Sequence, residues 1–479
     1  MTIYKNKYGQ INLFDDCKYF NKTNDINVSV SGGADSALML WMIFKEFSEK
    51  NIQKNLLVST MWASKSIRDG MPSNLQAAND VVKYVSSCFP DVKYKRFIYH
   101  SDINFIPYQT QEKKTEYKKI KLKEDKKFHN EMQKQFDTLP LHIWGETSNP
   151  EKGDRVAFKM DNSREYRRDP GNPFLEQKFM NNRSRWAPFI KFTKRFLSEI
   201  YKEYHLMDLF ALTESCVGLN TKGLPCKQCW WCNEKYWAFG YYDHLKKPLA
   251  ICTVLTGEKY SVNTVNKLYE NLYNNTSQLF DFYCYTDHVG LNDRIQVIPI
   301  TNKNKKLQWY KLDFFKNNFI ENEDIIIMDI DVDIIGNQDW LFKDYGYDFT
   351  GSHRWWWRWR EDNEDDKFAL SGTIYKFKNG EHQYIVDTFE NNIEYWEEYF
   401  IKNGTTVGPV NGEQHFVQKM LIDNNTNKGY FPEKMIVKWH NDFSIQLKLE
   451  RDYYKWSGND YIENDGWNPD IRMVHYAGG

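Results

Sequence analysis

The stretch "NVSVSGGADSALML", residues 27–40, determines how the first half of the chain is expected to fold. Its start belongs to the alternating segment "DINVSV", which predicts a strand, and "SALMLWMIFKEF" predicts a mostly buried helix. A strand that passes through two glycines directly into a buried helix is typical of the first unit of an α/β sheet. The turn "SGGADS" between them is therefore either a simple strand-to-helix connection or a phosphate site.

The alternation of strands and helices continues beyond this unit. Strands are predicted at "KNLLVSTMW" (54–62), "KYKRFIYH" (93–100) and "LHIW" (141–144), and a helix at "LQAANDVVKYVSSCF" (75–89). The order indicates a parallel, doubly wound sheet. The lysine-rich segment 112–127 predicts a solvated helix, with a basic surface for an anionic substrate as the alternative.

A second α/β domain is expected in the other half. Strands are predicted at "LAICTVLTG" (249–257), "LFDFYCYTD" (279–287), "RIQVIPI" (294–300) and "DIIIMDIDVDII" (324–335), with a helix at 261–273. We therefore place one domain at 1–246 and another at 248–479, as the length of 479 residues favours.

Bulk composition restricts the class of partner. The 64 basic and 65 acidic residues give a net charge of −1, which argues against a nucleic-acid or membrane partner for the chain as a whole. The N-terminal residues lack the apolar run of a signal peptide, and no stretch approaches 18 apolar residues. A soluble cytoplasmic protein is expected.

The glycine turn meets the requirements of a phosphate cradle. Such a cradle needs backbone N–H groups aimed at one point, glycines that permit close approach, and a helix N-terminus behind them. Five residues supply these features, namely Ser31, Gly32, Gly33, Asp35 and Ser36. No Gly-Lys-Ser/Thr follows, so the Walker pattern is absent.

This motif resembles SGGxDS, the signature of the PP-loop ATP pyrophosphatases, which have an adenine nucleotide alpha hydrolase-like fold. The resemblance implies that the loop holds the β,γ-pyrophosphate of ATP while an acceptor oxygen attacks the α-phosphate, yielding an adenylated substrate. It implies that Asp35 helps to position Mg²⁺ and that Ser31 and Ser36 bind phosphate oxygens. Thr60, at the end of the second strand, is a further candidate nucleotide contact.

Four of the eight cysteines form a cluster. Cys216, Cys226, Cys229 and Cys232 have the spacing C-x9-C-x2-C-x2-C. Four thiolates complete a tetrahedral Zn²⁺ site that is structural rather than catalytic. Disulfides and an iron–sulfur cluster are the alternatives.

The cluster narrows the resemblance to the 7-cyano-7-deazaguanine synthases of the queuosine pathway. "APFIKFTKRFLSEIYKEYHLMDLFALTESC" resembles the segment that precedes their cysteines, with Thr193, Lys194 and Cys216 in the matching places. "STMWASKS" departs from the family, as does the long insertion at 101–180, which leaves the substrate open. Arg183, Arg185 and Lys194 are candidate contacts to phosphate or carboxylate, or alternatively surface charges.

In "IIIMDIDVDIIGN", residues 325–337, three aspartates follow an apolar run. If the strand continues, alternation puts Asp329, Asp331 and Asp333 on one face. Three carboxylates together repel one another unless a divalent cation lies among them.

This stretch resembles the DxD motif of GT-A (Rossmann-like) glycosyltransferases. The resemblance implies that Asp329 and Asp331 hold Mn²⁺ or Mg²⁺ on the diphosphate of a nucleotide sugar. "LQWYKLDFF" resembles the helix before that strand and supplies Lys311, while "VHYAGG" resembles the end of glycogenin-like enzymes and makes His475 the third metal ligand.

Three further segments belong to the same resemblance. "LSGTIYKF" resembles the strand that faces the donor sugar, and "NGEQHF", with Glu413 and Gln414, resembles a later acidic-Gln motif. The aromatic and arginine side chains of "HRWWWRWR" (353–360) are suited to stacking on a base or a sugar acceptor. Alternatively, the segment packs as a loop over the site.

These observations predict a bifunctional enzyme. An ATP-dependent ligase or synthase would adenylate a deazapurine or nucleobase-like carboxylate for ammonia or amine attack. A metal-dependent glycosyltransferase would add a sugar, in nucleobase or nucleic-acid hypermodification. The predicted catalytic residues are Asp35, Ser36, Lys194 and Lys311.

Two alternatives remain open. The first is an ATP-dependent sulfur transferase fused to the glycosyltransferase, which needs a persulfide cysteine, with Cys88 or Cys17 as the candidate. The second is a non-catalytic nucleic-acid-binding scaffold.

Overall fold

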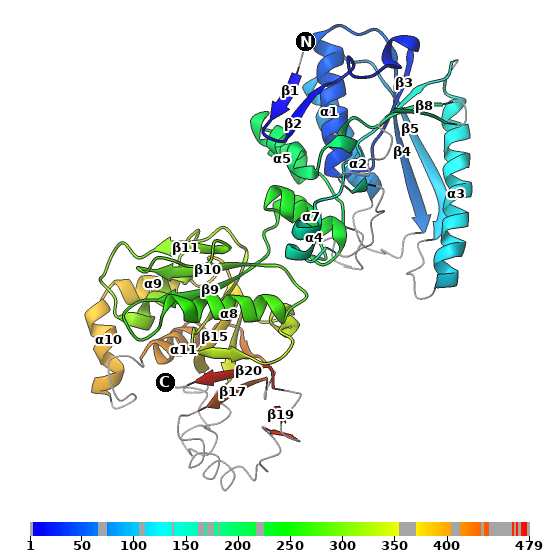
Figure 1. The fold of residues 1–479 in the computed structure, drawn as a ribbon. Helices are drawn as coiled ribbons and strands as arrows, with labels where there is room; N and C mark the ends of the chain where they lie inside the picture. The colour runs from blue at the N-terminus through cyan, green and yellow to red at the C-terminus, as the bar shows by residue number, and fades with distance from the viewer. Residues whose placement is uncertain are drawn as a thin grey trace. The chain divides into compact units, whose positions relative to one another are not determined.

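The computed structural model describes residues 3–65, 74–104, 111–136, 138–160, 168–169, 177–180, 183–216, 225–353, 370–403, 412–432, 435–439, 462–463, 466–467 and 471–476. The chain divides into two compact units, Met1–Lys246 and Lys247–Gly479 (Figure 1). Each unit is built around its own sheet.

The first unit contains a six-stranded sheet in the order β5-β4-β3-β6-β8-β7 and a separate β1-β2 hairpin. Its strands are β1 Ile3–Asn6, β2 Gly9–Asn12, β3 Asp25–Ser29, β4 Asn55–Lys65, β5 Lys95–Asn104, β6 Leu141–Trp144, β7 Gln177–Met180 and β8 Arg183–Trp186. Its α-helices are α1 Ala34–Glu49, α2 Asn74–Cys88, α3 Gln111–Gln133, α4 Lys152–Ala157, α5 Lys194–Glu203, α6 Met207–Ala211 and α7 Trp230–Phe239. Short 3₁₀ turns are η1 Phe20–Lys22, η3 Pro188–Lys191 and η4 Asp243–Leu245.

The strands predicted in this unit are confirmed, with one correction to the sheet. β3, β4, β5, β6 and β8 are parallel, but β7 pairs antiparallel with β8 at the edge. The prediction of a purely parallel sheet was therefore wrong. The two strands are close in sequence, and a short connection can join only antiparallel neighbours.

The strand order creates a switch point beside the glycine turn. From β3 the chain passes to β4 and β5 on one side, then returns to β6 on the other side of β3. Ligands of doubly wound sheets bind where the order reverses, outside the carboxyl ends of the strands. Residues 31–36 follow β3 and therefore lie at the carboxyl ends of the strands. The lysine-rich segment forms α3, which lies beside the edge strand β5 (Figure 1).

The second unit contains a seven-stranded sheet in the order β11-β10-β9-β12-β15-β14-β16 and a three-stranded sheet, β13-β20-β17. Its strands are β9 Leu249–Leu255, β10 Phe280–Thr286, β11 Ile295–Pro299, β12 Asp324–Met328, β13 Val332–Ile334, β14 Phe349–His353, β15 Leu370–Lys378, β16 Lys428–Tyr430, β17 Ile436–Trp439, β18 Ile462–Glu463, β19 Gly466–Trp467 and β20 Met473–Tyr476. Its helices are α8 Val262–Asn274, α9 Gln383–Glu390, α10 Ile393–Lys402, α11 Glu413–Asp423 and the 3₁₀ segments η5 Leu307–Phe315 and η6 Asp339–Phe342. The helices α9, α10 and α11 pack against one another (Figure 1).

β12 is a central strand that is buried on both faces. Ile325 and Ile327 pack into one hydrophobic cluster, and Ile326 and Met328 pack into the other. Two covered faces explain why the run is apolar without alternation, as the sequence predicted.

The three aspartates do not share a strand, which corrects the expectation of one face. β12 ends at Met328, and Asp333 lies in β13, which belongs to the smaller sheet. The chain changes sheets at residues 329–331, and side-chain alternation holds only within one continuous strand.

Candidate functional sites

The glycine turn is held by hydrogen bonds of its own side chains. The Ser36 hydroxyl donates to Gly33 O at 3.0 Å and accepts from Ser31 N at 3.1 Å. Gly32 has a φ of +82°, in the left-handed region that glycine adopts without strain. Gly33 is the N-cap of α1, so the turn ends at a helix N-terminus, which favours an anion.

A buried lysine reaches this turn from α5. Lys194 Nζ lies 3.1 Å from Asp35 Oδ1 and 2.9 Å from Glu234 Oε2. Lys194 is the first residue of α5, where the helix dipole disfavours a cation. The carboxylates of Asp35 and Glu234 compensate for burial and for this unfavourable position. A lysine at a helix N-terminus runs against the usual charge preference of helices, and such exceptions are expected at functional sites.

Two residues that follow β6 complete the surroundings of the turn, and neither was predicted from the sequence. Thr147 Oγ1 donates to Asp35 Oδ2 at 3.2 Å. Gly145 approaches so closely that a Cβ on it would lie 2.5 Å from Asp35 O. Their only sequence signal is position, since "GETS" directly follows the strand that pairs with β3.

Thr60 and Arg185, which were also predicted to contact a ligand, bond to other groups of the protein. The Thr60 hydroxyl donates to Val30 O at 2.7 Å and accepts from Arg96 Nη2 at 2.8 Å, so it joins β4 to β3. The Arg185 guanidinium forms an ion pair with Glu146 and lies over the Trp144 ring. The side chain of Arg183 lies outside the described residues, and nucleotide contact by Thr60 stays a prediction.

The four clustered cysteines converge on one point. Their Sγ atoms all lie within 4.8 Å of one another, and Cys226 Sγ is 3.9 Å from Cys232 Sγ. Four sulfurs about 2.3 Å from a tetrahedral Zn²⁺ would be about 3.8 Å apart, so the residues fit such an ion. No disulfide joins any of the eight cysteines, all of which lie in the described part of the chain, and this contradicts the disulfide alternative.

The aspartate site of the second unit is assembled by two sheets. Asp329 and Asp331 lie between β12 and β13, and His475 lies in β20; their ligand atoms all lie within 4.8 Å of one another. His475 Nε2 is 3.3 Å from Asp331 Oδ1 and 3.6 Å from Asp329 Oδ2. Two adjacent ligands of an octahedral divalent ion are about 3 Å apart, so this trio fits Mg²⁺ or Mn²⁺. Asp333 is not a member of the trio.

Neighbouring hydroxyl groups fix the orientation of the trio. Thr373 Oγ1 lies 3.0 Å from His475 Nδ1, and Tyr260 donates its hydroxyl to Asp331 at 2.7 Å. Burial alone would raise the pKa of Asp331, but the contacts with His475 and Tyr260 and the charge of Lys311 lower it to about 2. The Asp331 carboxylate is therefore anionic at neutral pH. Tyr260 and Thr373 were not selected from the sequence.

Lys311 supplies a buried cation to the same site. Its Nζ forms an ion pair with Asp329, donates to Gly372 O at 3.1 Å and lies 3.9 Å from Glu413 Oε2. Although burial opposes it, the charges of Asp329 and Glu413 raise the pKa of Lys311. Burial, opposed by Lys311, raises the pKa of Glu413 to about 7.

Two further expectations concern the strand β15 and the aromatic segment. Gln414 Oε1 accepts a hydrogen bond from Gly372 N at 2.9 Å, so the acidic-Gln motif contacts the "LSG" strand. Of "HRWWWRWR", only His353 is described, and its ring packs edge-on against Tyr430. Acceptor contact by the other residues, 354–360, lies outside the described residues.

The cysteines proposed for sulfur transfer are poorly placed for that role. Cys17 is buried, and Cys88 is exposed at the C-terminal end of α2. The helix α2 connects the parallel strands β4 and β5 and runs antiparallel to them. Its C-terminal end therefore lies near the N-terminal ends of the strands, whereas the glycine turn follows the C-terminal end of β3. This placement argues against the sulfur transferase alternative.

Among the described residues, no helix combines the length and the apolar character needed to cross a bilayer.

Comparison with known proteins gives distant structural similarity only. No family model and no curated protein matches the chain. The chain is similar to the galactosyltransferase LgtC, solved with donor and acceptor sugar analogs, at 11% identity over 48% of this chain and 87% of LgtC, with a TM-score of 0.31. It is also similar to the glycosyltransferase GlyE of Streptococcus pneumoniae TIGR4, at 11% identity over 48% of this chain and 54% of GlyE, with a TM-score of 0.31. Values this low support no inference about reaction or substrate, which must come from the site geometry.

Proposed function

We propose that the second unit transfers a sugar from a nucleotide sugar with the help of a divalent metal ion. The observation that supports this most is the convergence of Asp329, Asp331 and His475 beside the buried Lys311. The trio would hold Mn²⁺ or Mg²⁺, and the ion would stabilise the charge of the leaving nucleoside diphosphate.

The residues of the chain have distinct tasks in this proposal. Thr373 and Tyr260 would keep His475 and Asp331 in the orientation that a ligand needs. Thr373 bonds His475 Nδ1 and Tyr260 bonds Asp331 Oδ2, which leaves His475 Nε2 and Asp331 Oδ1 facing each other within the trio. Lys311 compensates part of the negative charge and adds a fixed cation near the diphosphate.

The stretch 329–333 provides its own matched control for the test. Asp331→Asn removes a ligand, while Asp333→Asn changes an aspartate two residues away that is outside the trio. We expect Asp331→Asn to lose Mn²⁺ binding in calorimetry and nucleoside diphosphate release from a panel of UDP-, GDP- and TDP-sugars. Asp333→Asn should retain both. Equal activity of the two variants would refute the proposal.

For the first unit we propose ATP-dependent adenylation. This proposal is supported by the contact of Lys194 with Asp35 and by the glycine turn at the switch point of the sheet. The turn would bind the β,γ-pyrophosphate of Mg²⁺-ATP and leave the α-phosphate open to an acceptor carboxylate. Release of AMP and pyrophosphate would accompany turnover, and exchange of labelled pyrophosphate into ATP measures the first step alone.

We further propose that both units act on one nucleobase-like product, adenylated and aminated by the first unit and glycosylated by the second. Mass spectrometry with ATP, ammonia, deazapurine carboxylates and nucleotide sugars tests this order. Sugar transfer to an unrelated acceptor class, with none to nucleobase, nucleoside or nucleic acid, would overturn it. Tight nucleic-acid binding without any turnover would instead favour the scaffold alternative.

A further inference from the structure

The helix α7 connects the four-cysteine site with the glycine turn. It begins after Cys229 and carries Cys232, Glu234 and Lys235 within its first two turns. Cys232 belongs to the cysteine cluster, and Glu234 contacts Lys194, which contacts Asp35. One short helix thus carries a residue of the four-cysteine cluster and the partner of a lysine that contacts the glycine turn.

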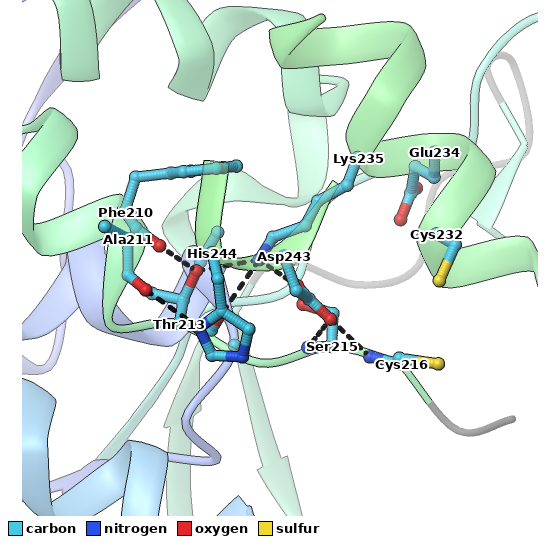
Figure 2. Close-up of polar contacts among 12 residues, drawn as sticks. Phe210, Ala211, Thr213, Ser215, Cys216, Cys232, Glu234, Lys235, Asp243 and His244 are labelled. Atoms are coloured by element: carbon cyan, nitrogen blue, oxygen red, sulfur yellow. Dashed lines mark hydrogen bonds and ion pairs between the residues drawn. The ribbon is translucent and has the colours of Figure 1, made fainter. Parts of the chain in front are cut away.

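Lys235 forms a second, fully buried connection. Its Nζ makes an ion pair with Asp243 and donates to Thr213 Oγ1 at 2.7 Å. Figure 2 shows Lys235 extending from α7 to Asp243, with Cys232 on the same helix. Burial tends to lower the pKa of Lys235, and the charge of Asp243 opposes that effect. An unpaired charge at this depth would be strongly destabilising, so the two residues need one another.

Asp243 in turn binds the backbone of the loop before the cysteine site. Its Oδ2 accepts from Ser215 N and from Cys216 N, both at 2.9 Å (Figure 2). The preceding residue of the same loop, Glu214, donates its N–H to Gly32 O at 2.8 Å. A Cβ on Gly33 would lie 3.3 Å from Ser215 Oγ, so the loop also packs on the turn.

We propose that Asp243, held by Lys235, is a positioning residue that fixes residues 214–216 and thereby couples the four-cysteine site to the glycine turn. Two hydrogen bonds that the backbone N–H groups of Ser215 and Cys216 donate to one carboxylate set the direction of this short segment. One end then presents Cys216 to the metal, and the other supports Gly32. The effect of Asp243 on ATP rests on the proposed function of the first unit, whereas its effect on Cys216 does not.

Asp243→Leu is the direct test because it keeps a similar volume and removes both side-chain oxygens, whereas the amide oxygen of asparagine would still accept from Ser215 N and Cys216 N. The double variant Lys235→Met/Asp243→Leu removes both charges and avoids an uncompensated lysine. Asp25→Leu is the matched control, since Asp25 is a buried aspartate that accepts from Thr138 N and Asn55 Nδ2 at the N-terminal end of β3, away from the glycine turn.

Two measurements are made on the full chain. Co²⁺ is the probe of the four-cysteine site, and its thiolate-to-metal charge-transfer absorption reports how many cysteines bind. Calorimetry gives the affinity for Mg²⁺-ATP. We expect both Asp243 variants to lose part of the charge-transfer band and to bind Co²⁺ and ATP about tenfold more weakly, as supporting residues around metal sites do. Asp25→Leu should lower the melting temperature and leave both measurements unchanged.

Each result bears on a separate part of the proposal. A wild-type cobalt spectrum and ATP affinity within about twofold in both Asp243 variants would overturn it. A changed spectrum with unchanged ATP affinity would overturn the coupling. Should the wild type bind no ATP, the proposed function fails, and the cobalt spectra still decide whether Asp243 places Cys216.

Discussion

Lys194 Nζ lies 3.1 Å from Asp35 Oδ1, so the first residue of α5 and the first turn of α1 meet at one ion pair. The lysine side chain is only 3% exposed, and its second partner, Glu234, is fully buried. Tyr201 of the same helix donates to Ala34 O at 2.8 Å, which ties α5 to the start of α1. The glycine turn therefore depends on a helix that is distant in sequence.

Lys194→Met should destabilise the first unit by about 3–5 kcal/mol, because it leaves buried carboxylates without their cation. Thermal unfolding measures this loss, and ATP–pyrophosphate exchange should disappear. The double variant Lys194→Met/Glu234→Gln should recover stability but not exchange. Lys202→Met, on an exposed part of α5, is the control and should resemble wild type. Recovery of exchange in the double variant would show that Lys194 has only a structural role.

Gly145→Ala should displace the glycine turn, since the added Cβ would lie 2.5 Å from Asp35 O and 2.8 Å from Ser36 N. Overpacking of this kind costs about 1–3 kcal/mol, and the KM for ATP should rise. Gly153→Ala provides the matched control, because its Cβ would meet nothing within 4 Å. In α4 that change should be neutral or stabilising by up to about 1 kcal/mol. Unchanged ATP kinetics in Gly145→Ala would contradict the close approach.

Thr373→Val should weaken Mn²⁺ binding by about 10- to 100-fold, because the hydroxyl that orients His475 is lost while the shape is kept. Isothermal calorimetry of the full chain measures the affinity. Thr373→Ser retains the hydroxyl and should bind Mn²⁺ as the wild type does. If the valine and serine variants bind equally, the contact with His475 has no influence on the metal.

Asp25 should contribute a pH-dependent share of stability. Burial alone would raise its pKa, but hydrogen bonds from Thr138 and Asn55 lower it below the unfolded value. A lowered folded pKa stabilises the protein above the unfolded pKa of about 3.9, and this stability is lost as the pH falls through the folded pKa. Asp25→Asn should therefore lower the melting temperature at pH 7, with a smaller difference at pH 3. The exposed Asp91→Asn variant should show no difference at either pH, and a constant gap for Asp25→Asn would contradict the assignment.

The sequence by itself determined the parts that depend on near neighbours. Alternating and continuous apolar runs predicted β3, β4, β9 and β12, and the buried helix α1 followed from "SALMLWMIFKEF". The cysteine spacing and the aspartate pair were also visible. Each of these signals comes from residues close together in the chain, where periodicity and turn chemistry act.

The tertiary structure decided which residues share a site. Thr147 and Gly145 reach the glycine turn because β6 pairs with β3, and Glu234 reaches Lys194 because α7 packs on α5. The same cause separated Asp333 from Asp329 and Asp331, since the chain enters another sheet at β13. A contact between distant segments depends on how whole elements pack, so it cannot be predicted from a local sequence pattern. The hydrogen bond from Cys216 N to Asp243 is an example.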